Sequence, residues 1–149
     1  MKNLYTIILL TLLSLLMPSL AAAQSFQNVS IADASTVYSI AQDEQGIMWF
    51  GTDHGLYAYD GYRSIPHNTD ADGTPVITRV HSICIFKDML YMATERGLMA
   101  YDIRRGRYAE RTSGGMGEMR AVTIYGGRLW YGGAQGLFSR DLQTGTKRT

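Results

Sequence analysis

The sequence predicts an all-β fold built of β-propeller blades, about three of them, each a four-stranded antiparallel sheet. The main observation is a repeat in which an aromatic residue is followed six positions later by Gly-Leu, with an Asp five positions after that glycine. The three copies are Trp49, Gly55 and Asp60; Tyr91, Gly97 and Asp102; and Trp130, Gly136 and Asp141. The glycines lie 42 and 39 residues apart, a period that matches one propeller blade. Beyond the N-terminal segment no window sustains a 3.6-residue apolar period, so no helix is expected there.

The first 23 residues are expected to be a signal peptide. Lys2 precedes an apolar stretch over residues 4–17, and the alanines at 21–23 form the small-x-small pattern that a signal peptidase accepts. Cleavage there leaves a mature domain over 24–149 and predicts a periplasmic protein. An uncleaved membrane anchor is the alternative, because residues 4–23 are just long enough to cross a bilayer. No later stretch is apolar enough to span one.

Turn signals divide the first blade, about residues 37–65, into four strands. The predicted strands are 37–42, 47–52, 56–59 and 62–65. They are rich in the aromatic and branched residues that favour strands. Gly46 ends the first turn, as a type I turn prefers, and Asp60-Gly61 is a hairpin signal.

The second and third blades, about residues 80–111 and 119–149, follow the same plan. Their predicted strands are 80–86, 89–93, 98–101 and 107–111, then 119–125, 128–132, 137–140 and a last strand after Gly145. A leading strand over 26–31 is expected to complete the last blade of a ring. Three blades fall below the four to eight that close a ring. The ring is therefore expected to be incomplete, with open edges that pair with further blades or with other copies of the chain.

The repeated residues have structural roles in this interpretation. The three aromatic residues are expected to fill the space between neighbouring blades. The three glycines are expected to adopt a positive φ in a turn, and the three aspartates to accept backbone N–H bonds in the next turn. Cys84 is the only cysteine, which excludes an intrachain disulfide, and it is expected to be a small buried apolar residue.

No catalytic residue, metal site or cofactor is predicted. The sequence has no Gly-rich phosphate loop, no nucleophile elbow and no Cys or His pair at metal-binding spacing. His54, His67 and His81 stand 13 and 14 residues apart, which is not the pattern of a zinc site. The formal net charge is +1, and the arginines are scattered over strands and turns. This pattern indicates a solvated surface rather than a nucleic-acid partner.

The turns between second and third strands differ among the three copies, and they carry the candidate ligand-binding residues. These are Asp53, His54, Glu95, Arg96 and Gln135. In a four-stranded meander these turns emerge on the same face as the connections between blades. Repeat scaffolds keep the residues that pack and vary the loops that contact partners. The alternative is that all five are solvated turn residues without a binding role.

The first repeat closely resembles the two-component regulator propeller repeat. A Val37-x-x-Ile40-x-x-Asp43-x-x-Gly46 segment precedes Trp49-x-Gly51-Thr52-x-x-Gly55-Leu56 and the turn Tyr59-Asp60-Gly61. The resemblance implies a β-propeller of the periplasmic region of hybrid two-component sensors. Members of that family bind oligosaccharides and signal across the inner membrane to a histidine kinase. It also implies that this chain is the N-terminal piece of a longer sensor.

The sequence therefore favours a non-catalytic, periplasmic propeller segment that senses an oligosaccharide. Two alternatives stay open. One is an exported scaffold that binds another protein through its loops or open edges. The other is a fragment of an exported propeller enzyme, such as a lyase, although no residue favours that class.

Overall fold

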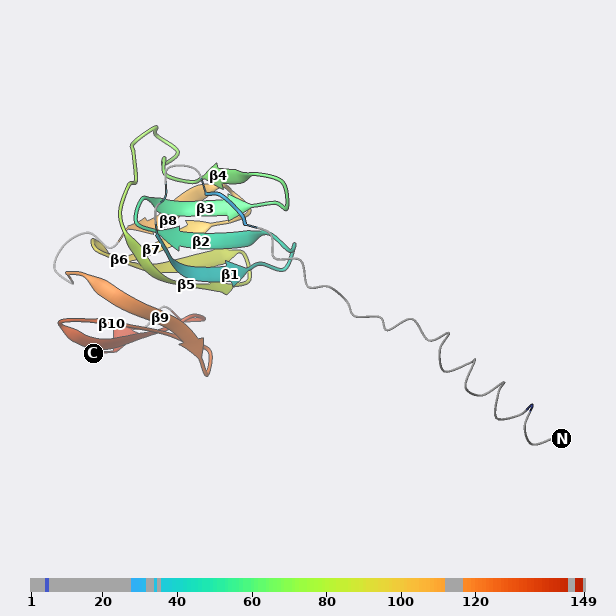
Figure 1. Cartoon of the computed structure of the whole chain (residues 1–149). Helices are drawn as coiled ribbons and strands as arrows, with labels where there is room; N and C mark the ends of the chain where they lie inside the picture. Colours follow the sequence, from blue (N-terminus) through green and yellow to red (C-terminus); the bar gives the residue numbers. More distant parts are fainter. Residues whose placement is uncertain are drawn as a thin grey trace.

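The chain folds into three four-stranded sheets in the computed structural model, which describes residues 5, 28–31, 34, 36–111, 117–144 and 147–148. Apart from Tyr5, the predicted signal peptide lies outside the described residues. Strand order in each sheet follows the order in the chain, and all neighbouring strands are antiparallel (Figure 1). The predicted all-β fold of three four-stranded antiparallel blades is confirmed.

The strands have the following bounds. The first sheet contains β1 (Val37–Gln42), β2 (Met48–Thr52), β3 (Gly55–Tyr59) and β4 (Ser64–Pro66). The second contains β5 (Val80–Phe86), β6 (Met89–Thr94), β7 (Gly97–Asp102) and β8 (Arg107–Arg111). The third contains β9 (Met119–Tyr125), β10 (Arg128–Gly133), β11 (Gly136–Asp141) and β12 (Lys147–Arg148).

Strand β4 begins two residues later than the sequence predicts. The backbone N–H groups of Tyr62 and Arg63 both donate to Asp60 Oδ1 at 2.9 Å, which keeps these two residues in the turn. The bonds from Arg63 and Tyr62 also lower the pKa of the Asp60 carboxyl. Backbone N–H bonds in the following turn likewise lower the pKa of Asp102 and of Asp141. The three repeated aspartates thus hold equivalent turns.

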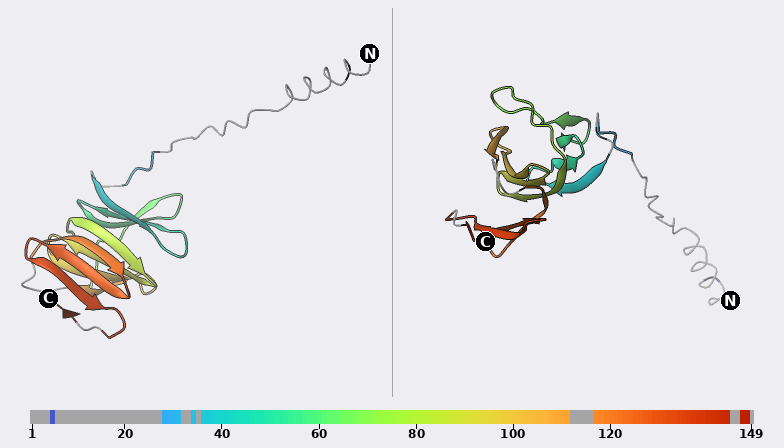
Figure 2. Two further views of the ribbon diagram at one scale, coloured as in Figure 1. Left: turned by 90° about the horizontal axis from the view of Figure 1, so that it is seen from below. Right: turned by 90° about the vertical axis from the view of Figure 1, so that its left-hand side faces the viewer.

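The sheets stack side by side, with their first strands β1, β5 and β9 next to one another (Figure 2). Two apolar clusters fill the spaces between sheets. The cluster between the first and second sheets includes Trp49, Leu56, Val80, Ile83, Leu90, Met92, Met99 and Tyr101. The cluster between the second and third includes Tyr91, Ala93, Leu98, Ala100, Met119, Val122, Leu129 and Tyr131. Burial of these side chains is the main favourable term in the packing of the sheets.

Two of the three repeated aromatic residues lie between sheets. Trp49 is buried against the second sheet, and its indole N–H donates to Asp43 Oδ2 at 2.8 Å. Tyr91 is buried against the third sheet. Trp130 occupies the equivalent position of the third sheet, where no sheet of the described chain covers it. Its indole N–H donates to the Tyr125 carbonyl at 3.3 Å.

A serine hydroxyl joins each sheet to the next. Ser39 Oγ accepts a hydrogen bond from the backbone N–H of Ile83 at 3.0 Å. Ser82 Oγ accepts from the N–H of Val122 and donates to its carbonyl, both at 3.3 Å. These bonds satisfy backbone groups of a first strand that its own sheet leaves unpaired on that side.

The predicted leading strand is not seen over its described part. Residues 28–31 pair with no strand of the described chain, and residues 26–27 lie outside the described residues. The segment runs past the face of the first sheet that points away from the second (Figures 1 and 2). Residues 28–31 can form the backbone hydrogen bonds of a β-strand only where the edge of another strand lies beside them. In the part of the chain that the structure describes, no helix has the length and apolar character to cross a membrane.

Candidate functional site

The predicted ligand-binding turns lie at one end of the sheets, which we call the loop end. In each sheet the start of the first strand pairs with the end of the second, as in the pairing of Val37 with Thr52 and of Val80 with Thr94. Each turn between second and third strands therefore lies beside the entry to its first strand. The connections between sheets reach the same end.

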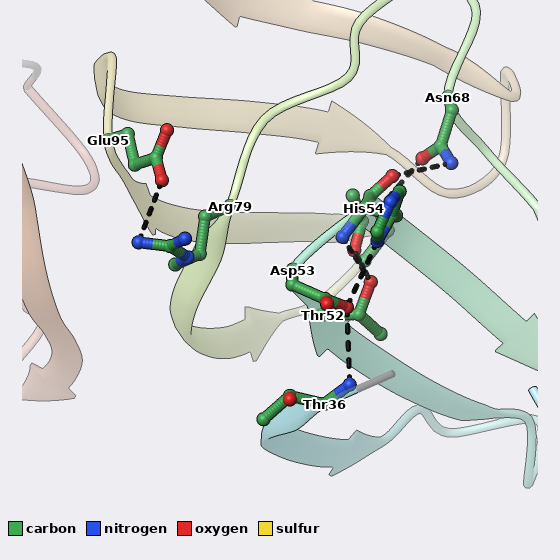
Figure 3. A network of polar contacts seen from close by, with 9 residues as sticks. Thr36, Thr52, Asp53, His54, Asn68, Arg79 and Glu95 are labelled. Atoms are coloured by element: carbon green, nitrogen blue, oxygen red, sulfur yellow. Dashed lines mark hydrogen bonds and ion pairs between the residues drawn. The ribbon is translucent and has the colours of Figure 1, made fainter. Parts of the chain in front are cut away.

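Asp53 fastens the entry to β1 (Figure 3). Its backbone N–H donates to the Thr36 carbonyl at 3.2 Å, and its Oδ1 accepts from the Thr36 N–H at 3.2 Å. Its Oδ1 also lies 3.2 Å from Nδ1 of His54, whose ring is half exposed. The Asp53 carboxylate is thus a positioning group, and the His54 imidazole is the part of this turn that reaches solvent.

Glu95 repeats this plan in the second sheet. Its backbone N–H donates to the Arg79 carbonyl at 3.2 Å, and its Oε1 lies 3.0 Å from Arg79 Nη1 (Figure 3). Both side chains are exposed. The adjacent Arg96 is exposed, and no ion pair within the described chain involves its guanidinium. Gln135 is exposed in the third turn, where its side chain lies against Gly117.

Asn68, in the connection after β4, ties that connection to the first turn. Its Oδ1 accepts from the Leu56 N–H at 2.9 Å, and its Nδ2 donates to the His54 carbonyl at 2.8 Å (Figure 3). The side chain occupies the space where a Cβ on Gly55 would project. Because both polar atoms of Asn68 are bonded, the connection and the turn form one rigid unit.

Sequence reasoning missed a row of residues on the first strands. The register of each first strand shifts near its start, between Val37 and Ser39, between Val80 and Ser82, and at the matching place in β9. Such a bulge displaces one residue from the ladder and redirects its side chain. The displaced residues are Tyr38, His81 and Arg120.

Contacts between these displaced residues cross all three sheets. The rings of Tyr38 and His81 lie 5.8 Å apart. His81 Nε2 lies 3.0 Å from Glu118 Oε1. The alignment of these two atoms is not that of a hydrogen bond, so the contact is a close approach of two polar groups. Glu118 Oε2 in turn lies 3.3 Å from Arg120 Nη2. Arg79 lies over the Tyr38 ring, 6.0 Å from its centroid. We call Tyr38, Arg79, His81, Glu118 and Arg120 the inner row.

The predicted turn residues and the inner row are organised differently. The contacts of Asp53 and of Glu95 join each turn to the entry of the first strand in its own sheet. Within the inner row, the contacts of Tyr38 with His81 and of His81 with Glu118 pass from one sheet to the next. One signal for the inner row was present in the sequence. His81 and Arg120 are polar residues in the first strands, at equivalent places in successive repeats. The bulges that bring these residues into one row arise from strand pairing, which could not be predicted from the sequence alone.

Two hollows lie away from the loop end. One of about 240 Å³ opens beside Trp49 and His67 and is bordered by Asp43 and Asp60. The Nδ1 of His67 lies 2.7 Å from the Tyr101 hydroxyl, and burial lowers the pKa of His67. The other hollow, of about 220 Å³, lies among turns at the opposite end of the sheets, between Glu44 and Lys87 among others.

Metal binding has no support within the described residues. No three His, Cys, Asp or Glu side chains in that part of the chain could together hold an ion. The three histidines have separate neighbours, since His54 lies by Asp53, His67 by Tyr101 and His81 by Glu118. Cys84 packs against the cluster between the second and third sheets, and burial raises the pKa of its thiol to about 12.

The stacked four-stranded meanders define the fold as successive blades of a β-propeller. The family described as two component regulator propeller matches residues 32–54, which confirms the resemblance of the first repeat to that family. No curated protein matches the chain.

Solved structures with the same fold include the extracellular domains of two proteins from B. thetaiotaomicron that are described as hybrid two component systems. The domain of BT4673 from B. thetaiotaomicron is 32% identical with a TM-score of 0.70, and the match covers 83% of this chain and 17% of that one. The domain of BT3049 from the same organism is 24% identical with a TM-score of 0.65, covering 83% and 20%. This chain thus spans a fifth or less of the length of either domain. The computationally designed Ika4 protein shares the fold at 16% identity, with a TM-score of 0.62 and coverage of 85% and 79%.

Proposed function

We propose that this chain is an exported, sensory propeller segment of a two-component signalling protein, and that its ligand is an oligosaccharide. The observation that carries the proposal is the similarity of 83% of the chain, at 32% identity, to the extracellular domain of such a system. An extracellular relative and the expected signal peptide together favour a periplasmic location.

The loop end offers suitable chemistry for a sugar. Sugar hydroxyls both donate and accept hydrogen bonds, and aromatic faces pack on the apolar faces of sugar rings. Tyr38 is partly exposed and supplies such a face beside His81. His54 and Arg96 supply exposed polar groups from two neighbouring turns. The proposed site therefore combines the turn residues with the inner row.

The proposed role is binding without catalysis. Asp53 is engaged with Thr36, and Glu95 with Arg79. A carboxyl group that serves in general acid–base catalysis must lie within reach of the substrate and have a suitable pKa. The contacts made by these two carboxylates instead position the turns, which suits a receptor.

Direct binding tests the proposal. The purified chain is titrated calorimetrically with a panel of oligosaccharides released from plant and host polysaccharides. His81→Ala and Arg96→Ala are expected to weaken a bound sugar at least tenfold, about 1.4 kcal/mol each. The matched control Lys87→Ala lies in the turn after β5 at the opposite end and is expected to leave affinity unchanged. Binding of no sugar in the panel, or equal losses for Lys87→Ala and His81→Ala, would contradict the proposal.

A further inference from the structure

The hollow beside Trp49 lies between the first and second sheets, away from the loop end. Its volume is about 240 Å³, just below the range of about 300–1,000 Å³ that is typical of small-molecule sites. Three half-buried isoleucines from separate segments line it. Ile47 precedes β2, Ile65 lies on β4, and Ile103 follows β7. Apolar side chains that stay partly exposed around one hollow are available to an apolar group of a ligand.

The first sheet has an aspartate in this hollow at a position where the second sheet has a phenylalanine. Strand pairing aligns Asp43 with Phe86, since each lies two residues after the partner of the repeated aromatic residue. Phe86 packs against the apolar cluster between the second and third sheets. Asp43 lines the hollow and has no ring with which to fill the corresponding space. The space between the first and second sheets can therefore take an aromatic ring from a ligand.

Both charged side chains in the described lining of the hollow are carboxylates, Asp43 and Asp60. Asp43 Oδ1 accepts two backbone N–H bonds, and its Oδ2 accepts the Trp49 indole N–H at 2.8 Å. A carboxylate oxygen can accept two hydrogen bonds, so Asp43 Oδ2 can accept one more. Asp60 Oδ2 lies 3.7 Å from Nε of Arg63, whose side chain is largely exposed, so this ion pair is weak. Burial lowers the pKa of His67, which also lines the hollow, so the lining carries a net negative charge at neutral pH.

We propose that this hollow binds a small primary arylalkylamine, a ligand in which a short alkyl chain joins an aromatic ring to an ammonium group. The ring lies among the three isoleucines, in the place that Phe86 takes in the second sheet. The ammonium group donates hydrogen bonds to Oδ2 of Asp43 and Oδ2 of Asp60. Such bonds between charged groups are stronger than those of a neutral ligand, so the hollow selects the amine over an uncharged analogue. The site is separate from the loop end, and it does not depend on the binding of a sugar there.

The two tryptophans of the chain provide the measurement. Each gives one indole N–H signal in a proton–nitrogen NMR spectrum, and the variant Trp130→Phe assigns the two signals. The full chain, recovered after export, is titrated with phenethylamine at neutral pH. Because the Trp49 indole N–H donates to Asp43 Oδ2, the Trp49 signal is expected to shift until the site is saturated, while the Trp130 signal stays in place. The uncharged analogue 2-phenylethanol is expected to bind at least about fivefold more weakly.

Two variants change the charge beside the hollow and leave its apolar lining intact. Asp60→Asn keeps an oxygen for the backbone N–H groups of its turn but loses the charge, and it is expected to weaken phenethylamine binding about fivefold. Arg63→Ala removes the cation that competes for Asp60, and it is expected to strengthen binding about twofold. Asp141→Asn is the matched control and is expected to leave the affinity unchanged. Asp141 holds the equivalent turn of the third sheet but does not line the hollow.

The same spectra show whether each variant is folded, so a loss of binding can be told from a loss of structure. Four results would each overturn the proposal. The first is a Trp49 signal that does not move with phenethylamine, and the second is equal affinity for phenethylamine and 2-phenylethanol. The third is an equal loss of affinity in Asp60→Asn and Asp141→Asn, and the fourth is weaker binding by Arg63→Ala.

Discussion

Replacement of Gly55 by alanine tests how the first turn is locked to the connection that follows β4. Gly55 has a φ of 117°, and so does Gly136 at the equivalent position of the third sheet. Alanine at either position is strained by roughly 1–3 kcal/mol, because residues with a Cβ rarely adopt this conformation. The two sites differ in their surroundings. A Cβ on Gly55 overlaps the side chain of Asn68, whereas a Cβ on Gly136 meets no atom within 4 Å.

The magnitude follows from the bonds that Asn68 has to break. To make room, its side chain gives up the bonds to the Leu56 N–H and to the His54 carbonyl. Each such bond is worth about 0.5–1.5 kcal/mol, so their loss adds roughly 1–3 kcal/mol to the strain. We therefore expect Gly55→Ala to cost roughly 2–6 kcal/mol of unfolding free energy, against roughly 1–3 kcal/mol for Gly136→Ala.

Urea unfolding followed by tryptophan fluorescence at a fixed protein concentration measures both values. The double variant Gly55→Ala with Asn68→Ala provides the control. If the alanine has already displaced Asn68, the double variant is expected to be little less stable than Gly55→Ala alone. Equal costs for Gly55→Ala and Gly136→Ala, or a fully additive double variant, would refute the reasoning.

Two further predictions concern titratable groups. Burial holds the pKa of His67 below its usual 6.5, so the unfolded chain binds the proton first as the pH falls. The unfolding free energy is therefore expected to fall as the pH drops from about 6.5 toward the pKa of the folded state. Urea midpoints measured at pH 7.5 and 5 should fall less for His67→Gln than for the unmodified chain, and an equal fall in both would contradict this. Burial raises the pKa of the Cys84 thiol to about 12. Iodoacetamide at pH 8 should therefore label the folded chain far more slowly than the urea-unfolded chain, and mass spectrometry measures both rates. Equal rates would show that the thiol is not protected.

The strands could be predicted from the sequence because turn residues punctuate them. The sequence-predicted bounds of β1, β5 and β9 agree with the structure. The fourth strand of the first sheet was predicted too early, since the Asp60 carboxylate holds Tyr62 and Arg63 in the turn, and such a bond depends on local geometry.

The candidate site was only partly predictable. The variable turns identified Asp53 and Glu95, but the structure uses both carboxylates to fasten strand entries. The inner row depends on bulges that appear only when strands pair, so His81 and Arg120 could not be assigned to it from spacing alone. The surroundings of Trp130 could not be predicted for a different reason. Its position in the repeat predicts packing against a neighbouring sheet, and the described residues contain no sheet on that side.

Ala121 occupies the position in the third sheet that Ser39 and Ser82 occupy in the first two. A methyl group there can neither accept the N–H nor donate to the carbonyl of an incoming strand. Whatever sheet packs on that side therefore lacks the directional bond that sets the height of one blade against the next. Such a junction differs in this respect from the two junctions between the described sheets, each of which contains a serine bridge.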